Sequence, residues 1–225
     1  MKRKTELILA LDKAKKKDFL YLLDSTKDLV SFYKIGLIPF IALGEEAVRM
    51  VKRRKGRVFL DLKFFDIPNT MIRASLNAFN WGIDMLDFHL MCDKSSLKHT
   101  VSSIKKEARR AKRKIYIMGV TVLTSESNNP TIHTQVINLA KKAKEAGCDG
   151  VIASGRDAKS LRSKLGKDFV IASPGVRLKE DASDQKRIVR PADVKGIVDY
   201  IIVGRPIYES KDPCKVILDI KGQLS

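Results

Sequence analysis

Two acids and a lysine lie close together in a stretch of the sequence that is otherwise apolar. Asp61 and Lys63 lie two apart near the end of the apolar segment 57–63, and Asp66 follows in a turn that Pro68 helps to shape. Successive side chains of a strand point to opposite faces, so Asp61 and Lys63 are expected on the same face. A carboxylate beside an ammonium in an apolar setting suits electrostatic and proton-transfer chemistry.

The alternative without a function is a solvated ion pair on a half-exposed strand. Such pairs are common and stabilise proteins little. The flanking residues Val58, Leu60, Leu62 and Phe64 are too apolar for a surface strand. Charges inside a fold persist when they are paired and used, so the flanks favour a functional cluster.

Polar side chains also stand at the ends of other apolar segments. Asp12 follows residues 7–11, and Lys34 closes residues 31–35. Taken singly, each is more often a surface residue, and His89 is more often a packing histidine. Together with Asp61 and its neighbours, they predict a rim of acids and bases on one face of the fold.

Two segments near the C-terminus predict a binding site for an anion. Pro174, Gly175 and Arg177 follow one apolar run, and Gly204 and Arg205 follow the next. Glycines let backbone N–H groups approach a ligand, a following helix start favours negative charge, and a guanidinium binds phosphate oxygens bidentately. A small phosphorylated substrate is therefore expected.

Short apolar runs alternate with amphipathic stretches along the chain, a pattern typical of strand–helix repeats around a parallel sheet. The eight expected strands are residues 7–11, 31–35, 57–63, 85–90, 115–120, 150–153, 170–173 and 200–203. The expected helices are residues 14–23, 41–54, 70–81, 97–111, 131–145, 157–165 and 207–221, whereas residues 180–196 are less plainly helical.

Eight such repeats in 225 residues predict an α/β fold with a single (β/α)8 barrel as one domain, residues 1–225. The active site of such a barrel lies at the C-terminal ends of the strands, where the polar residues fall. No Pro/Gly/Ser-rich linker divides the chain. An open doubly wound sheet is the alternative, although no GxGxxG motif follows the first strand.

The formal net charge of +18 predicts an acidic partner: nucleic acid, a membrane surface or a small anionic substrate. The densest basic block, residues 105–114, reads as a solvated helix face, and without interleaved aromatics it predicts no specific nucleic-acid partner. No apolar run reaches the roughly 20 residues that span a bilayer, and the first one is too short for a signal peptide. Three cysteines without CxxC spacing indicate reduced thiols in the cytoplasm and no zinc site.

The order and spacing of these segments resemble the orotidine 5′-phosphate decarboxylase family over nearly the whole chain. The most specific segment is DLKFFDIPNT at residues 61–70, with the pattern D-x-K-x-x-D-I-P-x-T. The other matching segments are LALD at 9–12, YKIG at 33–36, GVTVLTS at 119–125, SPGVR at 173–177, DQKR at 184–187 and VGRPI at 203–207. The resemblance implies decarboxylation of orotidine 5′-phosphate to UMP, the final step of de novo pyrimidine synthesis, by a homodimeric (β/α)8 barrel.

The resemblance also implies roles for individual residues. Lys34, Asp61 and Lys63 would form a charged array that Asp66 of the second subunit completes, and Lys63 would protonate C6 as carbon dioxide leaves. The substrate-binding residues would be Asp12, Thr70, Ser127, Ser125, Pro174, Arg177, Gln185, Gly204 and Arg205.

Asp12, Lys34, Asp66 and Thr70 would help to hold the ribose, with Asp66 and Thr70 reaching across from the partner subunit. The phosphate would be bound by Arg205, the Gly204 N–H, Gln185 and Arg177. Either Ser125 or Ser127 would contact the pyrimidine, because the family carries a serine or threonine after the fifth strand. The run that follows His89 departs from the glycine usual there, so His89 is expected to be structural.

The implied chemistry needs no cofactor and no metal. Loss of carbon dioxide from C6 leaves an electron pair that most decarboxylases delocalise into a cofactor, yet the sequence has no cofactor motif and no cluster of metal ligands. A preorganised ammonium at Lys63 can instead stabilise the developing carbanion and then protonate it.

Two alternative functions stay open at this level. Magnesium-dependent sugar-phosphate decarboxylases and aldolases of the same superfamily share the D-x-K-x-x-D segment, but they are expected to carry an acid where this chain has Lys34. A protonated lysine does not ligate magnesium. A basic nucleic-acid-binding barrel would explain the charge but would leave Asp61, Lys63 and Asp66 without a role.

Overall fold

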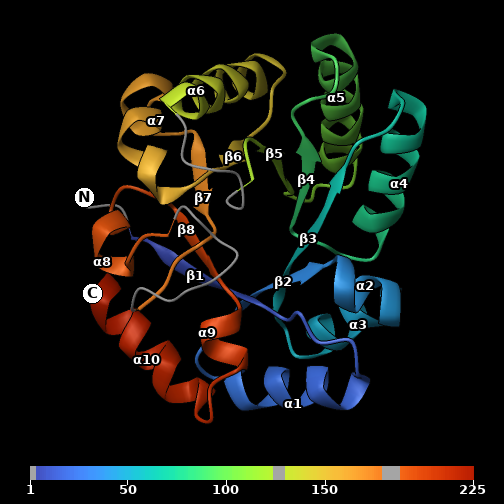
Figure 1. Cartoon of the computed structure of the whole chain (residues 1–225). Coiled ribbons are helices and arrows are strands. Elements are labelled where there is room, and N and C mark those ends of the chain that lie inside the picture. Colours follow the sequence, from blue (N-terminus) through green and yellow to red (C-terminus); the bar gives the residue numbers. More distant parts are fainter. Residues whose placement is uncertain (1–3, 124–129, 179–187) are drawn as a thin grey trace.

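The structure is a computed structural model that describes residues 4–123, 130–178 and 188–225 (Figure 1). Eight parallel strands close into a barrel in chain order, with β1 hydrogen-bonded to both β2 and β8. The strands are β1 Glu6–Ala10, β2 Phe32–Gly36, β3 Arg57–Phe64, β4 Met85–His89, β5 Tyr116–Val120, β6 Gly150–Ile152, β7 Val170–Ser173 and β8 Tyr200–Val203. The predicted (β/α)8 barrel is confirmed, and the open doubly wound sheet is excluded.

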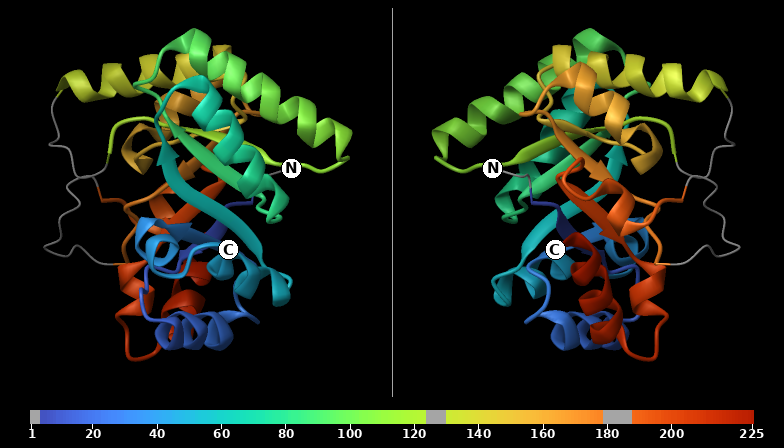
Figure 2. Two further views of the ribbon diagram at one scale, coloured as in Figure 1. Left: turned by 90° about the vertical axis from the view of Figure 1, so that its right-hand side faces the viewer. Right: turned by 90° about the vertical axis from the view of Figure 1, so that its left-hand side faces the viewer.

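Helices surround the strands on the outside of the barrel, as two side views show (Figure 2). They are α1 Lys16–Thr26, α2 Leu37–Leu43, α3 Glu45–Arg53, α4 Pro68–Asn80, α5 Lys94–Arg110, α6 Pro130–Glu145, α7 Ala158–Leu165, α8 Pro191–Val194, α9 Arg205–Tyr208 and α10 Pro213–Leu224, with a 3-10 turn at Gly155–Asp157. Among the residues described, no helix is long and apolar enough to cross a membrane.

Two expected helices are interrupted in the structure. Residues 41–54 were expected to form one helix, but α2 ends and α3 begins around Gly44, whose φ of 58° lies in the left-handed region that glycine tolerates best. Residues 207–221 divide into α9 and α10. The second of these begins at Pro213, where the Asp212 side chain accepts a hydrogen bond from Lys215 N at 2.9 Å.

The buried apolar residues form an inner and an outer layer. Side chains such as Ile8, Phe59 and Met118 fill the barrel interior, whereas the alternate residues of the strands pack outward against the helices. Complete burial of each large aliphatic or aromatic side chain contributes about 1.5–3 kcal/mol. The alternation along each strand therefore stabilises the barrel and its helical coat together.

Aromatic and charged side chains close the end of the barrel at which the strands begin. The rings of Phe32 and Tyr200 meet edge to face with centroids 5.5 Å apart, and the Arg57 guanidinium lies 4.3 Å from the Phe32 centroid. Arg57 also pairs with Glu6 of β1. This packing makes the interior a filled core and leaves the other end of the barrel for a ligand.

Candidate active site

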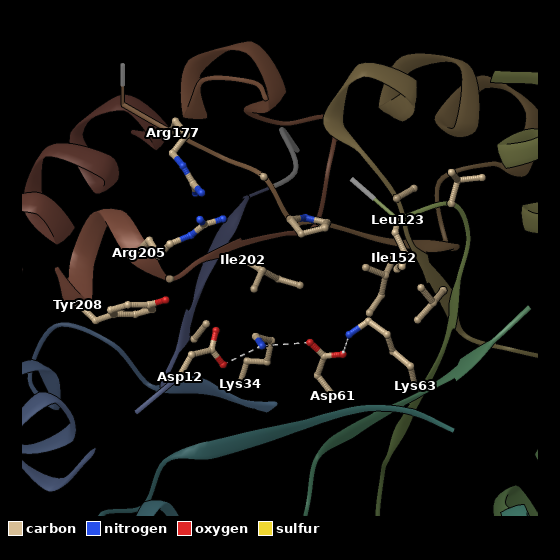
Figure 3. Close-up of a pocket in the computed structure, with 17 residues that line it drawn as sticks. Asp12, Lys34, Asp61, Lys63, Leu123, Ile152, Arg177, Ile202, Arg205 and Tyr208 are labelled. Atoms are coloured by element: carbon tan, nitrogen blue, oxygen red, sulfur yellow. Dashed lines mark hydrogen bonds and ion pairs between the residues drawn. The ribbon is translucent and has the colours of Figure 1, made fainter. Parts of the chain in front are cut away.

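A cavity of about 320 Å³ lies at the C-terminal ends of the strands (Figure 3). Its charged lining side chains come from both ends of the chain: Asp12, Lys34, Asp61, Lys63, Arg177 and Arg205. The remaining lining residues are Ala10, Val120, Val122, Leu123, Ile152, Ala153, Pro174, Gly175, Ile202, Gly204 and Tyr208. Of the expected rim of acids and bases, Asp12, Lys34, Asp61 and Lys63 therefore line one cavity with an apolar wall.

Four of these side chains, on or just after the first three strands, form a chain of alternating charge. The Lys34 ammonium lies between two carboxylates, 3.2 Å from Asp12 Oδ1 and 3.1 Å from Asp61 Oδ2. The other oxygen of Asp61 accepts a hydrogen bond from Lys63 Nζ. The dashed lines in Figure 3 trace this array from Asp12 to Lys63.

The array fixes the ionisation of its two central members. Burial disfavours the charged forms of both Asp61 and Lys34, whose side chains are only 11% and 12% exposed. The neighbouring opposite charges outweigh burial: Lys34 and Lys63 lower the pKa of Asp61 to about 2, and Asp61 and Asp12 raise the pKa of Lys34. The site therefore holds a fixed carboxylate beside fixed positive charge at neutral pH.

Gly36 at the end of β2 leaves the space that the Lys34–Asp12 pair occupies. A Cβ atom at position 36 would lie 2.8 Å from Lys34 Nζ and 3.1 Å from Asp12 Oδ1. The glycine that follows Lys34 by two residues is thus required by the ion pair rather than by a turn.

Asp61 and Lys63 lie together as expected, but regular alternation along β3 is not the reason. Leu60 pairs with Leu86 and Phe64 with Phe88, so three residues of β3 lie opposite one residue of β4. Within this bulge Lys63 has a φ of 49°, an uncommon left-handed conformation for a residue other than glycine. The bulge places the Lys63 ammonium against Asp61 at the edge of the cavity.

The residue of β4 opposite the bulge is Asp87, which the sequence analysis missed. Its Oδ1 accepts a hydrogen bond from Lys63 N at 2.9 Å, and its side chain is fully buried. Burial and the nearby Asp61 carboxylate raise the pKa of Asp87 well above its ordinary value. The signal was in the sequence, since Met85, Asp87 and His89 alternate along one strand and share its inner face.

The other end of the cavity is cationic. Figure 3 shows the guanidinium groups of Arg177 and Arg205 close together, on the opposite side of the cavity from Lys63. Arg177 is only 6% exposed, and its backbone is held by a short bridge in which Arg177 N donates to Val189 O at 3.0 Å. Gly175, with a φ of 75°, allows the turn that begins this segment.

Gly204 and Tyr208 form the wall next to Arg205. A Cβ atom on Gly204 would lie 3.1 Å from the Tyr208 ring and 3.3 Å from the Ala10 Cβ, so β8 can approach β1 closely here only without a side chain. Tyr208 was not predicted as a lining residue. Nothing in the neighbouring sequence marks Tyr208 as a cavity residue, because a tyrosine in a short helix after a strand is usually a packing residue.

Several predicted residues lie elsewhere. Asp66 and Thr70 are exposed and, in the part of the chain described, are not among the residues that line the cavity. His89 lines a neighbouring groove, where its Nδ1 accepts a hydrogen bond from Met91 N at 3.3 Å; burial, aided by Lys63, lowers its pKa. The remaining predictions, Ser125, Ser127 and Gln185, fall outside the described residues.

The acids of the array already have cationic partners. Asp12 pairs with Lys34, and Asp61 pairs with both lysines. Within residues 4–123, 130–178 and 188–225, no group of three or more His, Cys, Asp or Glu side chains is arranged to hold a metal ion. The charged groups that line the cavity are ammonium, guanidinium and carboxylate groups.

Comparisons with known proteins find sequence matches over nearly the whole chain. A sequence profile of the orotidine 5′-phosphate decarboxylase / HUMPS family matches residues 5–220. A protein of Geobacter metallireducens named orotidine 5′-phosphate decarboxylase is 38% identical over 97% of this chain and 95% of its own length. One from Helicobacter pylori strain Shi470 with the same name is 38% identical over 96% of this chain and 98% of its own.

Solved structures give the same result. A crystal structure of orotidine 5′-phosphate decarboxylase from Lactobacillus acidophilus superposes with a TM-score of 0.83 at 27% identity, covering 98% of this chain and 99% of the other. The enzyme of that name from Pyrococcus horikoshii OT3 gives a TM-score of 0.76 at 25% identity, covering 97% and 98%.

Proposed function

This chain belongs to the orotidine 5′-phosphate decarboxylase / HUMPS family, and we propose that it converts orotidine 5′-phosphate to UMP in pyrimidine biosynthesis. The observation that carries this proposal is the Asp12–Lys34–Asp61–Lys63 array, which faces two arginines across one cavity. The substrate has a ring carboxylate at one end and a phosphate at the other. The charged array at one end of the cavity suits the ring carboxylate, and the two arginines at the other end suit the phosphate.

Lys63 is the proposed proton donor. As the bond between C6 and the carboxylate breaks, the electron pair stays on C6 and carbon dioxide leaves. A fixed ammonium beside C6 stabilises that charge as it develops, and its proton then forms the new C6–H bond. Lys63 is left as a neutral amine that takes a proton from solvent before the next turnover.

Asp61 acts through its fixed negative charge. Because its pKa lies at about 2, it stays ionised beside the substrate carboxylate and repels it in the ground state. That repulsion falls as the carboxylate becomes neutral carbon dioxide. Asp61 also holds both Lys34 and Lys63, so it orders the cations that stabilise the carbanion.

Arg177, Arg205 and the Gly204 N–H are the proposed phosphate ligands, with Gln185 completing the set. Guanidinium groups bind phosphate bidentately, and Gly204 lines the cavity next to Arg205, where its N–H is proposed to donate to a phosphate oxygen. Binding energy from the phosphate, remote from C6, can orient the ring against Lys63. Pro174 and Asp12 are proposed to hold the base and the ribose, and Ser125 or Ser127 the pyrimidine edge.

The reaction is proposed to need no metal or cofactor. Lys34 stands where a magnesium-dependent relative would require an acid, and its raised pKa keeps it charged. Its ammonium holds Asp12 and Asp61 within hydrogen-bonding distance. A protonated lysine in that position competes with a divalent cation instead of ligating it.

A homodimer is proposed to complete the site with Asp66 and Thr70 of the partner subunit. We define the rim patch as the exposed large apolar residues near the ends of β2, β3 and β4: Leu37, Ile38, Ile41, Phe65, Ile67 and Met91, which are 56–80% exposed. Such residues on one side of a protein mark an interface. Phe65 and Ile67 flank Asp66, so covering the rim patch with a second copy would carry Asp66 to the partner.

A cytoplasmic location is proposed as well. Cys92, Cys148 and Cys214 are all free thiols, and two of them are buried. Unpaired cysteines suit a reducing compartment.

The test of the proposed function is turnover of orotidine 5′-phosphate, followed by ultraviolet absorbance in the presence of a chelator. We expect the protein to ignore the chelator and Lys63→Ala to lower kcat by about a thousandfold or more, because that variant loses both the positive charge and the proton. Lys52→Ala is the matched control. It removes a lysine that pairs with Asp84 at 3.0 Å outside the cavity, and it should turn over at the wild-type rate.

The same preparation should be offered a hexulose phosphate with magnesium. Activity on that sugar phosphate together with inactivity on orotidine 5′-phosphate would place the chain in the magnesium-dependent branch. Substantial turnover of orotidine 5′-phosphate by Lys63→Ala would instead remove Lys63 as the proton donor while leaving the substrate assignment intact.

A further inference from the structure

Asp87 is the one residue of β4 that lies opposite the three-residue bulge of β3. Leu86 and Phe88 on either side of it pair with Leu60 and Phe64 in the strand ladder. The bulge takes Lys63 N out of the regular ladder, and the Asp87 carboxyl supplies its acceptor at 2.9 Å. One oxygen of Asp87 thus fixes the backbone of the proposed proton donor.

The second oxygen of Asp87 differs from the first. Oδ2 is buried and, within the described residues, has no hydrogen-bond partner. The same residues give Asp87 no ion-pair partner either, since the two lysines pair with Asp61 and Asp12. A buried carboxylate without a cation is costly, so such a group usually takes up a proton.

Asp61, itself a carboxylate with two lysine partners, lies close enough to interact with the Asp87 side chain. Two ionised carboxylates only accept hydrogen bonds, so they cannot bond to each other. A single proton on Asp87 removes both difficulties, because the Asp87 O–H can then donate to Asp61.

We propose that Asp87 is a positioning residue that acts as a neutral carboxylic acid: Oδ1 accepts the Lys63 N–H, and the Oδ2 hydroxyl donates to the Asp61 carboxylate. This inference rests on the proposed function of Lys63 and Asp61. In this role Asp87, a buried residue next to the cavity, would hold Lys63 in its left-handed conformation and donate a hydrogen bond to Asp61 from a neutral group.

The surroundings of Asp87 support a neutral side chain. The charged groups that face it are Asp61 and Lys63 of β3, and His89 follows on β4 itself. On the other side, β5 contributes Met118, its partner in the ladder, which carries no charge. Full burial together with the negative charge of Asp61 raises the pKa of Asp87, and the contribution of Lys63 only partly opposes this.

A neutral Asp87 also has a chemical consequence. An ionised group at this position would add a negative charge near the carbanion that forms at C6, and would raise the energy of the transition state. The fold thus places two carboxyl groups side by side and separates their roles by environment, one ionised and one protonated.

The first test compares Asp87→Asn with Asp87→Ala. The amide of asparagine can accept the Lys63 N–H and donate to Asp61, as the protonated acid does, whereas alanine can do neither. We expect alanine to lower kcat by about tenfold to a hundredfold with KM changed less than about threefold, as a misplaced catalytic group does. Asparagine should recover most of that kcat, with the pH profile of the wild type.

Met85→Ala is the matched control for damage to the strand. It empties a fully buried position on the same face of β4, one step further into the barrel, without touching the Lys63 N–H. It should lower the melting temperature but keep kcat when turnover is measured well below melting. If Met85→Ala and Asp87→Ala lose kcat equally, the positioning role is wrong.

The second test reads the proton directly in the wild-type protein without substrate. Infrared spectra at neutral pH, with carbon-13 label in aspartate, should show the carbonyl stretch of one protonated carboxylic acid. That band should vanish in Asp87→Asn. A wild-type spectrum without the band, or an Asp87→Asn protein that folds yet loses as much kcat as Asp87→Ala, would overturn the neutral acid. Failure of wild-type turnover on orotidine 5′-phosphate would count against the proposed function alone.

Discussion

Lys34 is the residue on which the charge array depends, because it is the one that joins Asp12 to Asp61. Its two carboxylates outweigh the cost of burying an ammonium, and its charge in turn keeps Asp61 ionised. The array is therefore cooperative, since removal of one member leaves the others buried and unmatched.

Replacing Lys34 by methionine keeps most of the side-chain volume but removes the charge. We expect the free energy of unfolding to fall by about 3 kcal/mol, because Asp61 loses one of its two cations while buried. Urea denaturation measures this change. Lys52→Met breaks a pair whose side chains are about one-third exposed, and it should cost under about 1 kcal/mol. Equal losses in the two variants would mean that the array contributes no more than a surface pair.

Asp61 and Asp87 should have opposite effects on stability as pH changes. Asp61 has a lowered pKa of about 2, so the stability it contributes is present above its unfolded value of about 4 and is lost as pH falls toward 2. Asp87 has a raised pKa, so its contribution is present below about pH 4 and is lost as pH rises through its folded value.

Asp87→Asn isolates the second effect. The stability of the wild type relative to this variant should decline as pH rises above 4, by at most about 1.4 kcal/mol per unit. Urea unfolding at a series of pH values measures the difference. Both proteins should still lose stability as the pH falls toward 2, because both retain Asp61. Curves that stay parallel above pH 4 would show that Asp87 is already ionised there.

For single residues, the sequence shows which side chains are functional better than it shows how they are arranged in space. Asp61, Lys63 and Lys34 stand out because charged residues interrupt apolar segments. The bulge that joins Asp61 to Lys63 depends on pairing with β4, and no local pattern in β3 encodes that register. Asp87 was missed for a related reason: an acid on the inner face of a strand reveals its partner only after two strands are aligned.

Among the elements, the turn from β2 into α2 contacts the candidate active site at Gly36, which lies against Lys34 and Asp12. We expect Gly36→Ala to lower kcat by about tenfold or more, because its Cβ would push the Lys34 ammonium from a distance of 2.8 Å. The folding cost should be small, since the flexible end of a lysine can move. Steady-state kinetics and thermal melting separate the two effects.

Gly222→Ala is the control for that substitution. Position 222 lies in α10 with open space around it, so alanine should stabilise the helix by about 0.5–1 kcal/mol and leave kcat unchanged. A Gly36→Ala enzyme with wild-type kcat would show that the Lys34–Asp12 geometry tolerates displacement.

The strands could be predicted from sequence because those of a parallel barrel are buried on both faces and read as apolar runs. Helix interruptions could not be predicted as well. Gly44 lies inside an amphipathic pattern that continues on both sides of it, and only its left-handed backbone in the folded chain separates α2 from α3.

For the whole molecule, the shared site of the proposed homodimer makes a quantitative prediction. Lys63→Ala and Asp66→Asn proteins should each be nearly inactive. After their subunits are mixed and exchanged, each mixed dimer has one site with both residues intact, so turnover should recover to about a quarter of the wild-type value. Mixing Lys63→Ala with the Lys63→Ala, Asp66→Asn double variant is the control, and it should recover nothing.

Recovery would also need the two copies to meet through the rim patch. Ile41 is 80% exposed, so Ile41→Asp should place a charge in the interface. We expect this variant to sediment as separate subunits and to abolish the recovery of turnover. If exchanged subunits regain no turnover while sedimentation shows dimers, Asp66 acts within its own subunit.

The pairing of β1 with β8 also bears on how the protein is made. Lys34, Asp61 and Lys63 leave the ribosome early, whereas Arg205 and the strand that closes the barrel are synthesised near the end. An unfinished chain therefore carries the reactive charges without Arg205 and with two unpaired strand edges. Because it lacks a proposed phosphate ligand, we expect such a product to be inactive, and its unpaired strand edges make it prone to associate with other chains.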